Sequence, residues 1–395
     1  MWQKTKNIYH LLNATWANIY YLFPSRKLTV IGVTGTDGKT TTASLIYHIL
    51  KTAGKNVSAI SSIEALINGK TYDTGFHVTT PSSWKLQRLL KQISNPDGPL
   101  NRTGKKYVVL EVTSHALDQH RIWGINFEAA VLTNVTDEHL DYHKTYKNYV
   151  LTKLKLLKKA KIAVTNYDDD SFKIISKDKV SAQLITYGNS QEANVSMRDF
   201  SFDKIFFGQF NNYNVLAAAA ICKSLGIPKE TIVKAVNSFE LPKGRQEIVH
   251  DDDFIVMIDF AHTPNAFVKL LQSARKETKG RIIHVFGSAG KRDTAKRPLM
   301  GKASDKFSDV IILTSEDPRG ESVGEIMDDI EKGIKNKSVI RIADRQDAIG
   351  RAIKMAKKDD LVVLTGKSHE KSMNFGNGEE FWDEYEAVEK ALKKL

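Results

Sequence analysis

The chain has 395 residues, of which 41% are hydrophobic and 26% are charged. These values are typical of a soluble globular protein with more than one domain. No apolar run approaches the ~18–20 residues that a membrane-spanning helix needs, and residues 1–27 lack the apolar core of a secretory signal. The single cysteine, Cys222, excludes a disulfide within the chain, so we expect a cytoplasmic protein.

The formal net charge is +12, which suits nucleic acid, an anionic membrane surface or acidic substrates. The lysines are dispersed and often alternate with apolar residues, as on solvated helix faces. We find no motif that reads RNA or DNA, and therefore expect no nucleic-acid partner.

Residues 1–27 are the first predicted element, a helix that Pro24 should end. Two alternatives follow from its pattern. The helix packs against the next domain, or it lies on an anionic membrane, with Lys4, Lys6, Arg26 and Lys27 at its flanks. The apolar residues at roughly helical spacing are Ile8, Leu11, Leu12, Trp16, Ile19, Leu22 and Phe23.

Residues 28–54 read as a buried strand, a glycine-bearing turn and a helix. Such a turn directs backbone N–H groups and a helix N-terminus at one point, where an anion is favoured. Lys39 adds charge for phosphates and Thr40 a hydroxyl for Mg²⁺. An ordinary strand–turn–helix is the alternative. The candidate nucleotide-binding residues are Gly35, Thr36, Asp37, Gly38, Lys39, Thr40 and Thr41.

Strand-like and helical runs alternate along the rest of the chain. Over residues 28–240 they predict a central ATP-binding domain of the α/β class, with a mainly parallel sheet. Residues 184–207 look like short extended segments of a small antiparallel patch. A second alternation over residues 241–395 predicts a Rossmann-like C-terminal domain, and the family resemblance described below implies that this domain binds an amino acid.

Several longer motifs accompany the loop, namely "LEVTSHALDQHR" (110–121), "TNVTDEHLDYH" (133–143), "GQFNNYN" (208–214), "IDFAHTPNA" (258–266) and "FGSAGKRDTAKRP" (286–298). Together with G-T-D-G-K-T-T, they resemble the Mur ligase family, most closely its UDP-N-acetylmuramyl-tripeptide synthetase branch. The resemblance implies an ATP- and Mg²⁺-dependent ligase, which joins an amino acid to a muramyl-peptide-type acceptor through an acyl phosphate. It also implies that the family's UDP-binding domain is missing here, with residues 1–27 in its place.

The resemblance assigns roles to residues of the central domain. Glu111 also stands at a strand end beside the phosphate loop, where the chemistry itself favours a Mg²⁺ ligand. His139 and Lys153 would complete a second metal site. Lys153 lies ten residues beyond His143, and the resemblance implies that a lysine at this position is carbamylated. Asn211 and Asn214 would contact the nucleotide base. The implied acceptor contacts are Thr79, Thr80, Thr113, Gln119 and Arg121.

In the C-terminal half, the resemblance implies that Arg245 lies beside the phosphates, Asp259 at the ribose and His262 near the phosphates. Arg292 would grip the carboxylate of the incoming amino acid. The implied catalytic residues are Lys39, His139, Lys153 and His262.

Two departures from the family pattern bear on the amino acid. Residues 316–319 read E-D-P-R where diaminopimelate-adding members carry D-N-P-R, so Asp317 should favour a cationic group. Arg319 can pair with a second carboxylate. Residues 366–370 read G-K-S-H-E where the family carries G-K-G-H-E, so Ser368 replaces a glycine, while Gly366 and the ammonium partner Glu370 are kept. We expect a diaminopimelate-like substrate, with lysine as the alternative.

Two other functions remain open. A ligase of the folylpolyglutamate type also begins at its phosphate loop, although the motifs around residues 110–143 and 366–370 argue against it. A basic P-loop ATPase that binds nucleic acid would explain the charge but not the C-terminal motifs.

Overall fold

The structure is a computed structural model, and it describes residues 2–67, 69–72, 79–95, 104–178, 180, 182–204, 206 and 208–395. The chain divides into two compact units, with the boundary after Glu240; residues 208–209 group with the second unit. Each unit is described by itself below. His77 and Val78, which precede the predicted acceptor contacts Thr79 and Thr80, lie outside the described residues.

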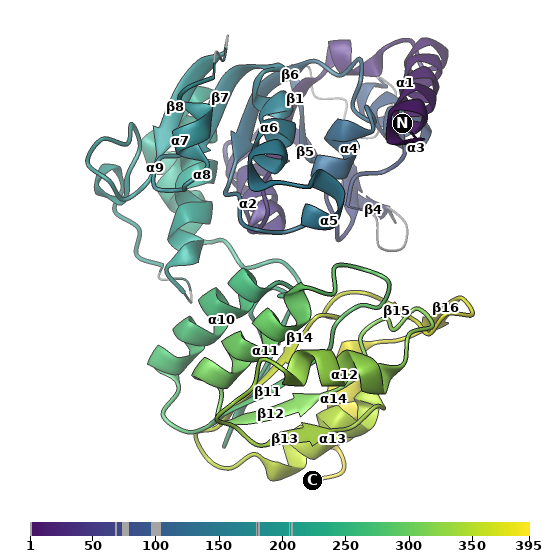
Figure 1. Ribbon diagram of the computed structural model, residues 1–395. Helices are drawn as coiled ribbons and strands as arrows, with labels where there is room; N and C mark the ends of the chain where they lie inside the picture. Colours follow the sequence, from purple (N-terminus) through teal and green to yellow (C-terminus); the bar gives the residue numbers. More distant parts are fainter. Residues whose placement is uncertain are drawn as a thin grey trace. The chain divides into compact units, whose positions relative to one another are not determined.

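Unit 1 is built on one sheet whose strand order is β4-β3-β2-β5-β1-β6-β7-β8 (Figure 1). From β2 to β8 neighbouring strands run parallel, whereas β3 and β4 form an antiparallel edge. The strands are β1 (Thr29–Thr34), β2 (Asn56–Ile60), β3 (Ala65–Ile67), β4 (Lys70–Tyr72), β5 (Lys106–Glu111), β6 (Phe127–Leu132), β7 (Ala160–Asn166) and β8 (Gln183–Tyr187).

Helices cover both faces of this sheet. The helices α2, α8 and α9 pack together on one face, and α4 and α6 pack on the other, where α3 contributes to the same apolar core. The helices are α1 (Trp2–Tyr20), α2 (Lys39–Thr52), α3 (Ser83–Ser94), α4 (Ser114–Asp118), α5 (Leu140–His143), α6 (Tyr146–Leu157), α7 (Phe172–Ile175), α8 (Phe210–Ser224) and α9 (Lys229–Asn237). Short 3₁₀ turns span Pro24–Lys27 and Met197–Asp199.

Unit 2 has a second sheet, in the order β13-β12-β11-β14-β10-β9, in which only the edge pair β10–β9 is antiparallel among the described strands. Helices α10, α11 and α12 form one apolar core against it, and α13 and α14 form another. The elements are β9 (Glu247–Asp251), β10 (Ile255–Asp259), α10 (Pro264–Glu277), β11 (Ile282–Phe286), α11 (Lys296–Phe307), β12 (Val310–Leu313), α12 (Val323–Glu331), β13 (Val339–Arg341), α13 (Arg345–Met355), β14 (Leu361–Thr365), β15 (Ser372–Asn374), β16 (Glu379–Phe381) and α14 (Glu384–Leu392).

These arrangements confirm the predicted fold class, an α/β chain with mainly parallel sheets and a Rossmann-like second half. The antiparallel patch predicted for residues 184–207 is wrong. Within the described part of that stretch, β8 pairs in parallel with β7, and Val195 makes a parallel bridge to Tyr187. Strand β8 pairs in parallel because its backbone hydrogen-bonds to β7, and the residue pattern of one segment does not show which strand it will pair with.

The N-terminal helix α1 ends at Tyr20, four residues before Pro24. Leu22 and Phe23 follow with positive φ angles of 60° and 50°, so the helix stops before the proline is reached. Among the described helices of the chain, none is long and apolar enough to cross a membrane.

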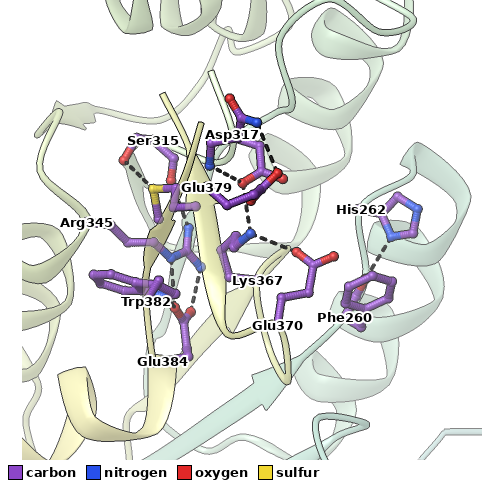
Figure 2. A network of polar contacts seen from close by, with 12 residues as sticks. Phe260, His262, Ser315, Asp317, Arg345, Lys367, Glu370, Glu379, Trp382 and Glu384 are labelled. Carbon is purple, nitrogen blue, oxygen red and sulfur yellow. Dashed lines mark hydrogen bonds and ion pairs between the residues drawn. The ribbon is translucent and has the colours of Figure 1, made fainter. Parts of the chain in front are cut away.

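A fully buried ion pair joins the two helices on one face of unit 2. Arg345 at the start of α13 donates to both carboxylate oxygens of Glu384 at the start of α14, at 2.6 and 2.9 Å (Figure 2). The same guanidinium donates to the Thr365 carbonyl at 2.8 Å, and the indole N–H of Trp382 donates to Glu384 at 2.8 Å. The pair therefore ties α13 and α14 to the end of β14.

Glu384→Ala should lower the free energy of unfolding by about 3–5 kcal/mol, because it leaves the Arg345 charge buried without its partner. Glu389→Ala, which removes an exposed pair with Lys393 in the same helix, should cost less than about 1 kcal/mol. Denaturant unfolding of both variants measures the difference. The double variant Arg345→Met/Glu384→Met should be more stable than Glu384→Ala, and the reverse order would contradict this account.

Candidate active site

Three neighbouring parallel strands of unit 1 end at the same edge of the sheet. Val33 of β1 lies opposite Glu111 of β5, and Thr34 of β1 lies opposite Leu132 of β6. The phosphate loop follows β1 directly, and Thr133 follows β6. Chemistry-bearing residues that are far apart in the sequence therefore meet where ligands bind in open α/β sheets.

The phosphate loop is closely packed at both of its glycines. A Cβ on Gly38 would lie 2.2 Å from Oδ1 of Asn214, and one on Gly35 would lie 1.8 Å from the Thr133 hydroxyl. Gly38 also has a φ of 78°, which favours glycine. The ammonium of Lys39 donates to the Thr36 carbonyl at 2.7 Å. The helix α2 begins at Lys39, so its N-terminus adjoins the loop, an arrangement that favours an anion there.

The residues after β6 hold this loop from one side. The Asp37 carbonyl accepts hydrogen bonds from the Thr133 hydroxyl at 2.6 Å and from the Asn134 amide at 3.1 Å. The Asp37 N–H donates back to Oδ1 of Asn134 at 3.0 Å, and the Thr36 N–H donates to its carbonyl at 2.9 Å. Sequence reasoning missed these two residues as loop contacts, although they open the "TNVTDEHLDYH" motif.

Glu111 is buried at the end of β5 and meets the first turn of α2. Its Oε2 accepts a hydrogen bond from the Thr40 hydroxyl at 3.3 Å, and its Oε1 accepts one from the Ser62 N–H at 3.4 Å. The Ser62 and Thr40 hydroxyls lie 3.0 Å apart. These oxygen donors have the chemistry that Mg²⁺ prefers, so the residues fit the ion. Ser62 was not predicted.

Lys153 is fully buried in α6. Its amine donates to the Gly35 carbonyl at 2.6 Å and lies 4.4 Å from the centre of the Tyr149 ring. Burial lowers the pKa of the Lys153 amine well below its ordinary value, and the Lys39 charge lowers it further, against the opposing effects of Glu138 and Asp37. A neutral amine is the form that can add CO₂, so this environment fits the expected carbamate.

The predicted second metal site is less complete. His139 has a φ of 56°, and its Nε2 lies 3.7 Å from the Glu138 carboxylate. His143 lies 3.0 Å from the Ser114 hydroxyl, and burial lowers the pKa of His143 to about 4. Among the described residues, no cluster of three or more histidine, cysteine or acidic side chains could hold a metal. As an amine Lys153 is not an oxygen ligand, so a metal at His139 depends on the carbamate.

Four of the predicted acceptor residues are connected by hydrogen bonds. The Thr80 hydroxyl donates to the Glu111 carbonyl at 3.1 Å and accepts from the Thr113 N–H at 3.0 Å. Arg121 donates to the Thr80 carbonyl at 2.9 Å and to Oε1 of Gln119 at 2.7 and 3.0 Å. The predicted acceptor contacts therefore adjoin the candidate Mg²⁺ ligand. Thr79 is half-buried beside them.

Asn211 and Asn214 are both buried and lie on one face of α8, where the Asn214 amide donates to Asn211 at 3.0 Å. Oδ1 of Asn214 lies 3.4 Å from the Thr42 hydroxyl and close to Gly38. The structure thus places Asn214 against the phosphate loop, and the base contact stays a prediction. Thr41, the last predicted loop residue, is buried in the first turn of α2.

In unit 2, three of the predicted nucleotide residues lie close together. Asp259 ends β10 and accepts hydrogen bonds from the N–H groups of Gln246 and Ala261, at 2.8 and 2.7 Å. The Arg245 guanidinium lies 4.5 Å from the centre of the Phe260 ring. His262 Nδ1 lies 2.9 Å from the Phe260 carbonyl (Figure 2).

The residues predicted for the amino acid surround a buried lysine that the sequence analysis passed over. The Lys367 ammonium donates to Oδ1 of Asp317 at 2.9 Å and to Oε2 of Glu370 at 2.8 Å (Figure 2). Arg319 Nη2 lies 3.4 Å from the other Asp317 oxygen. The cationic group expected beside Asp317 is therefore present in the protein itself, which weakens the argument that Asp317 selects a cationic substrate.

Gly366 and Glu316 line the same loop. Gly366 has a φ of 102°, and a Cβ there would lie 2.2 Å from the buried Oε2 of Glu316. Burial raises the pKa of Glu316 to about 7. Ser368 turns away, with its hydroxyl donating to the Gly244 carbonyl at 2.8 Å. Arg292 is exposed.

Comparison with known proteins shows which family the chain belongs to. Residues 33–222 match the Mur ligase middle domain, and residues 244–368 match the glutamate ligase domain of Mur ligases. The UDP-N-acetylmuramoyl-L-alanyl-D-glutamate–2,6-diaminopimelate ligase 1 of Clostridium acetobutylicum is 38% identical over 95% of this chain and 80% of that protein. The chain belongs to the Mur ligase family.

Two further members of this group of enzymes show the same similarity. The corresponding diaminopimelate ligase of Aquifex aeolicus is 41% identical over 90% of this chain and 75% of that protein. The MurF ligase of Thermotoga maritima, solved in complex with ADP, superposes with a TM-score of 0.69 over 96% of this chain and 83% of that one, at 19% identity. The first comparison supports the predicted branch, and the second shows the fold. Membership of a ligase family favours the ligase prediction over a nucleic-acid-binding ATPase.

We expect Lys153 to carry a carbamate when bicarbonate is present. In ¹³C-bicarbonate at about pH 8, the protein should show a carbamate carbon resonance that is absent from Lys153→Met, because burial lowers the pKa of this amine and so enlarges the neutral fraction that can add CO₂. Lys155→Met, a substitution of the half-exposed lysine on the same helix, is the matched control and should keep the signal. A resonance of equal size in Lys153→Met would contradict the assignment.

Proposed function

We propose that this Mur ligase uses ATP and Mg²⁺ to join an amino acid to the carboxylate of a muramyl-peptide-type acceptor. The observation that carries the proposal is the contact between Thr40 of the phosphate loop and the buried carboxylate of Glu111, with the predicted acceptor residue Thr80 bonded to the Glu111 carbonyl. The residues predicted for nucleotide, metal and acceptor thus adjoin at one sheet edge.

In the first step, an acceptor carboxylate oxygen attacks the γ-phosphorus of ATP, and the bond to the β-phosphate oxygen breaks to release ADP. The protein has little covalent work in such a transfer and mainly positions and neutralises charge. Lys39 and the backbone N–H groups around Gly38 would bind the phosphates. Thr40 and Glu111 would hold Mg²⁺, which supplies further positive charge when bound.

In the second step, the amino group attacks the acyl phosphate carbonyl, the carbon–oxygen bond to phosphate breaks, and the nitrogen loses a proton. The residues around Lys367 are candidates to bind the amino acid. Lys367 donates to the carboxylates of Asp317 and Glu370 and so holds both in place. Carboxylates with fixed positions would orient the amino group of the incoming amino acid.

We propose a diaminopimelate-like amino acid, as in the names of the relatives, with lysine as the alternative. The difference between the two substrates is a distal carboxylate. Arg319 is partly exposed, and its Nη2 lies 3.4 Å from one Asp317 oxygen, while the other oxygen of that carboxylate is bound by Lys367. Its guanidinium is therefore available to pair with a substrate carboxylate.

The proposal is tested by incubating the chain with ATP, Mg²⁺ and UDP-N-acetylmuramoyl-L-alanyl-D-glutamate, the acceptor in the relatives' names, and then measuring ADP release for each amino acid in a panel. Release that requires both acceptor and one diamine is the expected result. Release that is independent of both would contradict a ligase.

Lys39→Ala and Glu111→Gln should each lower the rate of ligation by about 10²–10³, because each removes charge that stabilises the transferred phosphoryl group. The matched control for Lys39→Ala is Lys51→Ala, a substitution of an exposed lysine at the other end of α2. All three variants should keep the far-UV circular dichroism of the parent. Ligation within about threefold of the parent in either site variant would refute the assigned roles.

Arg319→Ala should weaken binding of diaminopimelate by about 1.5–3 kcal/mol, through loss of one charge-assisted pair, and should leave lysine nearly unaffected. KM values for both amino acids measure the contrast, with Arg351→Ala on α13 as a control for loss of an exposed arginine. Equal losses for the two amino acids would show that Arg319 does not contact a distal carboxylate.

A further inference from the structure

The helix α1 has two different faces, and the one that packs against unit 1 is made of small and polar residues. Ala14, Ala17 and Asn18 are fully buried. Asn18 donates to the Trp123 carbonyl at 2.8 Å, and Asn7 donates to the Asp118 carboxylate at 3.0 Å. The helix also packs on α3, beside which it lies in Figure 1. Leu11 is half-buried, and the helix is attached to the unit mainly through small and polar side chains.

Most of the large apolar side chains of α1 face solvent instead. Ile8, Leu12, Trp16 and Ile19 are 60%, 54%, 62% and 48% exposed. Their spacing of four, four and three residues puts them on one side of the helix. A contiguous apolar stripe of this kind is unusual on the surface of a soluble protein and marks an interaction site.

Aromatic rings continue the stripe beyond the end of the helix. Tyr20 is 70% exposed, and its ring centroid lies 5.6 Å from that of Trp84 on α3. Tyr21 lies 6.2 Å from the same tryptophan and 4.9 Å from Tyr20. Tyrosine and tryptophan are the side chains enriched where one end of a ring is apolar and the other is wet, as at the surface of a bilayer.

The charge around the stripe has one sign. The first acidic residue in the sequence is Asp37, so residues 1–36 carry basic charge and no acidic charge. Arg26 and Lys27 are exposed just after the helix. The neighbouring helix α3 contains Lys85, Arg88 and Lys91 and likewise no acidic residue. Charge complementarity therefore requires an anionic partner.

We infer that the exposed face of α1, together with Trp84 and the adjacent basic residues, binds the surface of an anionic lipid bilayer. An amphipathic helix with apolar and aromatic residues on one side and basic flanks lies in the plane of such a surface, with its apolar side chains among the acyl chains. The helix is not apolar enough to cross the membrane. A second copy of this chain is a poorer occupant, because two such faces would oppose like charges.

The packing face of the same helix contacts the segment that holds the predicted acceptor residues. Asn7 bonds to Asp118, and Gln119 follows directly in the chain. If the proposed function holds, the bilayer would bring this side of unit 1 to acceptors that carry a lipid. Binding to the bilayer does not depend on that function, so a failure of vesicle binding and a failure of ligase activity can be told apart.

The test is flotation of the full chain with vesicles of phosphatidylglycerol and phosphatidylcholine, and with vesicles of phosphatidylcholine alone, at low and high salt. The full chain should float with the anionic vesicles at low salt and much less at high salt. Ile8→Gln/Leu12→Gln/Trp16→Gln should bind about tenfold or more weakly, because it removes the apolar contact. The matched control is Ile248→Gln/Leu299→Gln/Phe381→Gln, which changes three exposed apolar residues of unit 2 and should bind normally.

A second pair of variants tests the charge. Arg26→Gln/Lys27→Gln should lose about fivefold in affinity for each charge removed, whereas Arg351→Gln/Lys354→Gln, exposed on α13, should change it by less than about twofold. Brominated lipids should quench Trp16, and Trp16→Phe should lower the quenched fraction of the fluorescence. No flotation with anionic vesicles at low salt would overturn the inference, as would equal losses in the site and control variants. A concentration-dependent dimer that the α1 triple variant abolishes would overturn it in favour of a second copy.

Discussion

The parallel register of β5, β1 and β6 is the constraint on which the rest of the site depends. Because Val33 lies opposite Glu111, the phosphate loop and the candidate Mg²⁺ carboxylate leave the sheet at the same edge. Because Thr34 lies opposite Leu132, the two residues that follow β6, Thr133 and Asn134, reach the same loop. A shift of one residue in either pairing would turn these side chains to the other face of the sheet.

Each unit contains a fully buried lysine, Lys153 in unit 1 and Lys367 in unit 2. Lys153 donates to a loop carbonyl, and burial lowers the pKa of its amine well below the ordinary value, as suits the proposed modification. Lys367 is bound by the carboxylates of Asp317 and Glu370, as suits a fixed charge that orients its neighbours. Both side chains are fully buried, so they differ in the hydrogen-bond partners that the surrounding loops provide.

The features that could be predicted are those set by short stretches of sequence. The β-branched run before a glycine-bearing turn predicted the phosphate loop, and the two alternations of strands and helices predicted the fold class. The role of Ser62 could not be predicted, because its contact with Thr40 depends on β2 lying next to β5 in the sheet. The contacts of Lys367 could not be predicted for a similar reason. Its partners Asp317 and Glu370 meet it only because residues 366–368 turn through positive φ angles at Gly366 and Ser368.

The central claim is that one sheet edge activates an acceptor carboxylate by phosphorylation. The most direct measurement uses UDP-N-acetylmuramoyl-L-alanyl-D-glutamate labelled with ¹⁸O in its free carboxylates, together with ATP, Mg²⁺ and the preferred amino acid. The account predicts that each phosphate released carries one ¹⁸O atom, in step with the ADP formed, because the carboxylate oxygen stays on phosphorus when the amide forms. Unlabelled phosphate, or AMP in place of ADP, would contradict it.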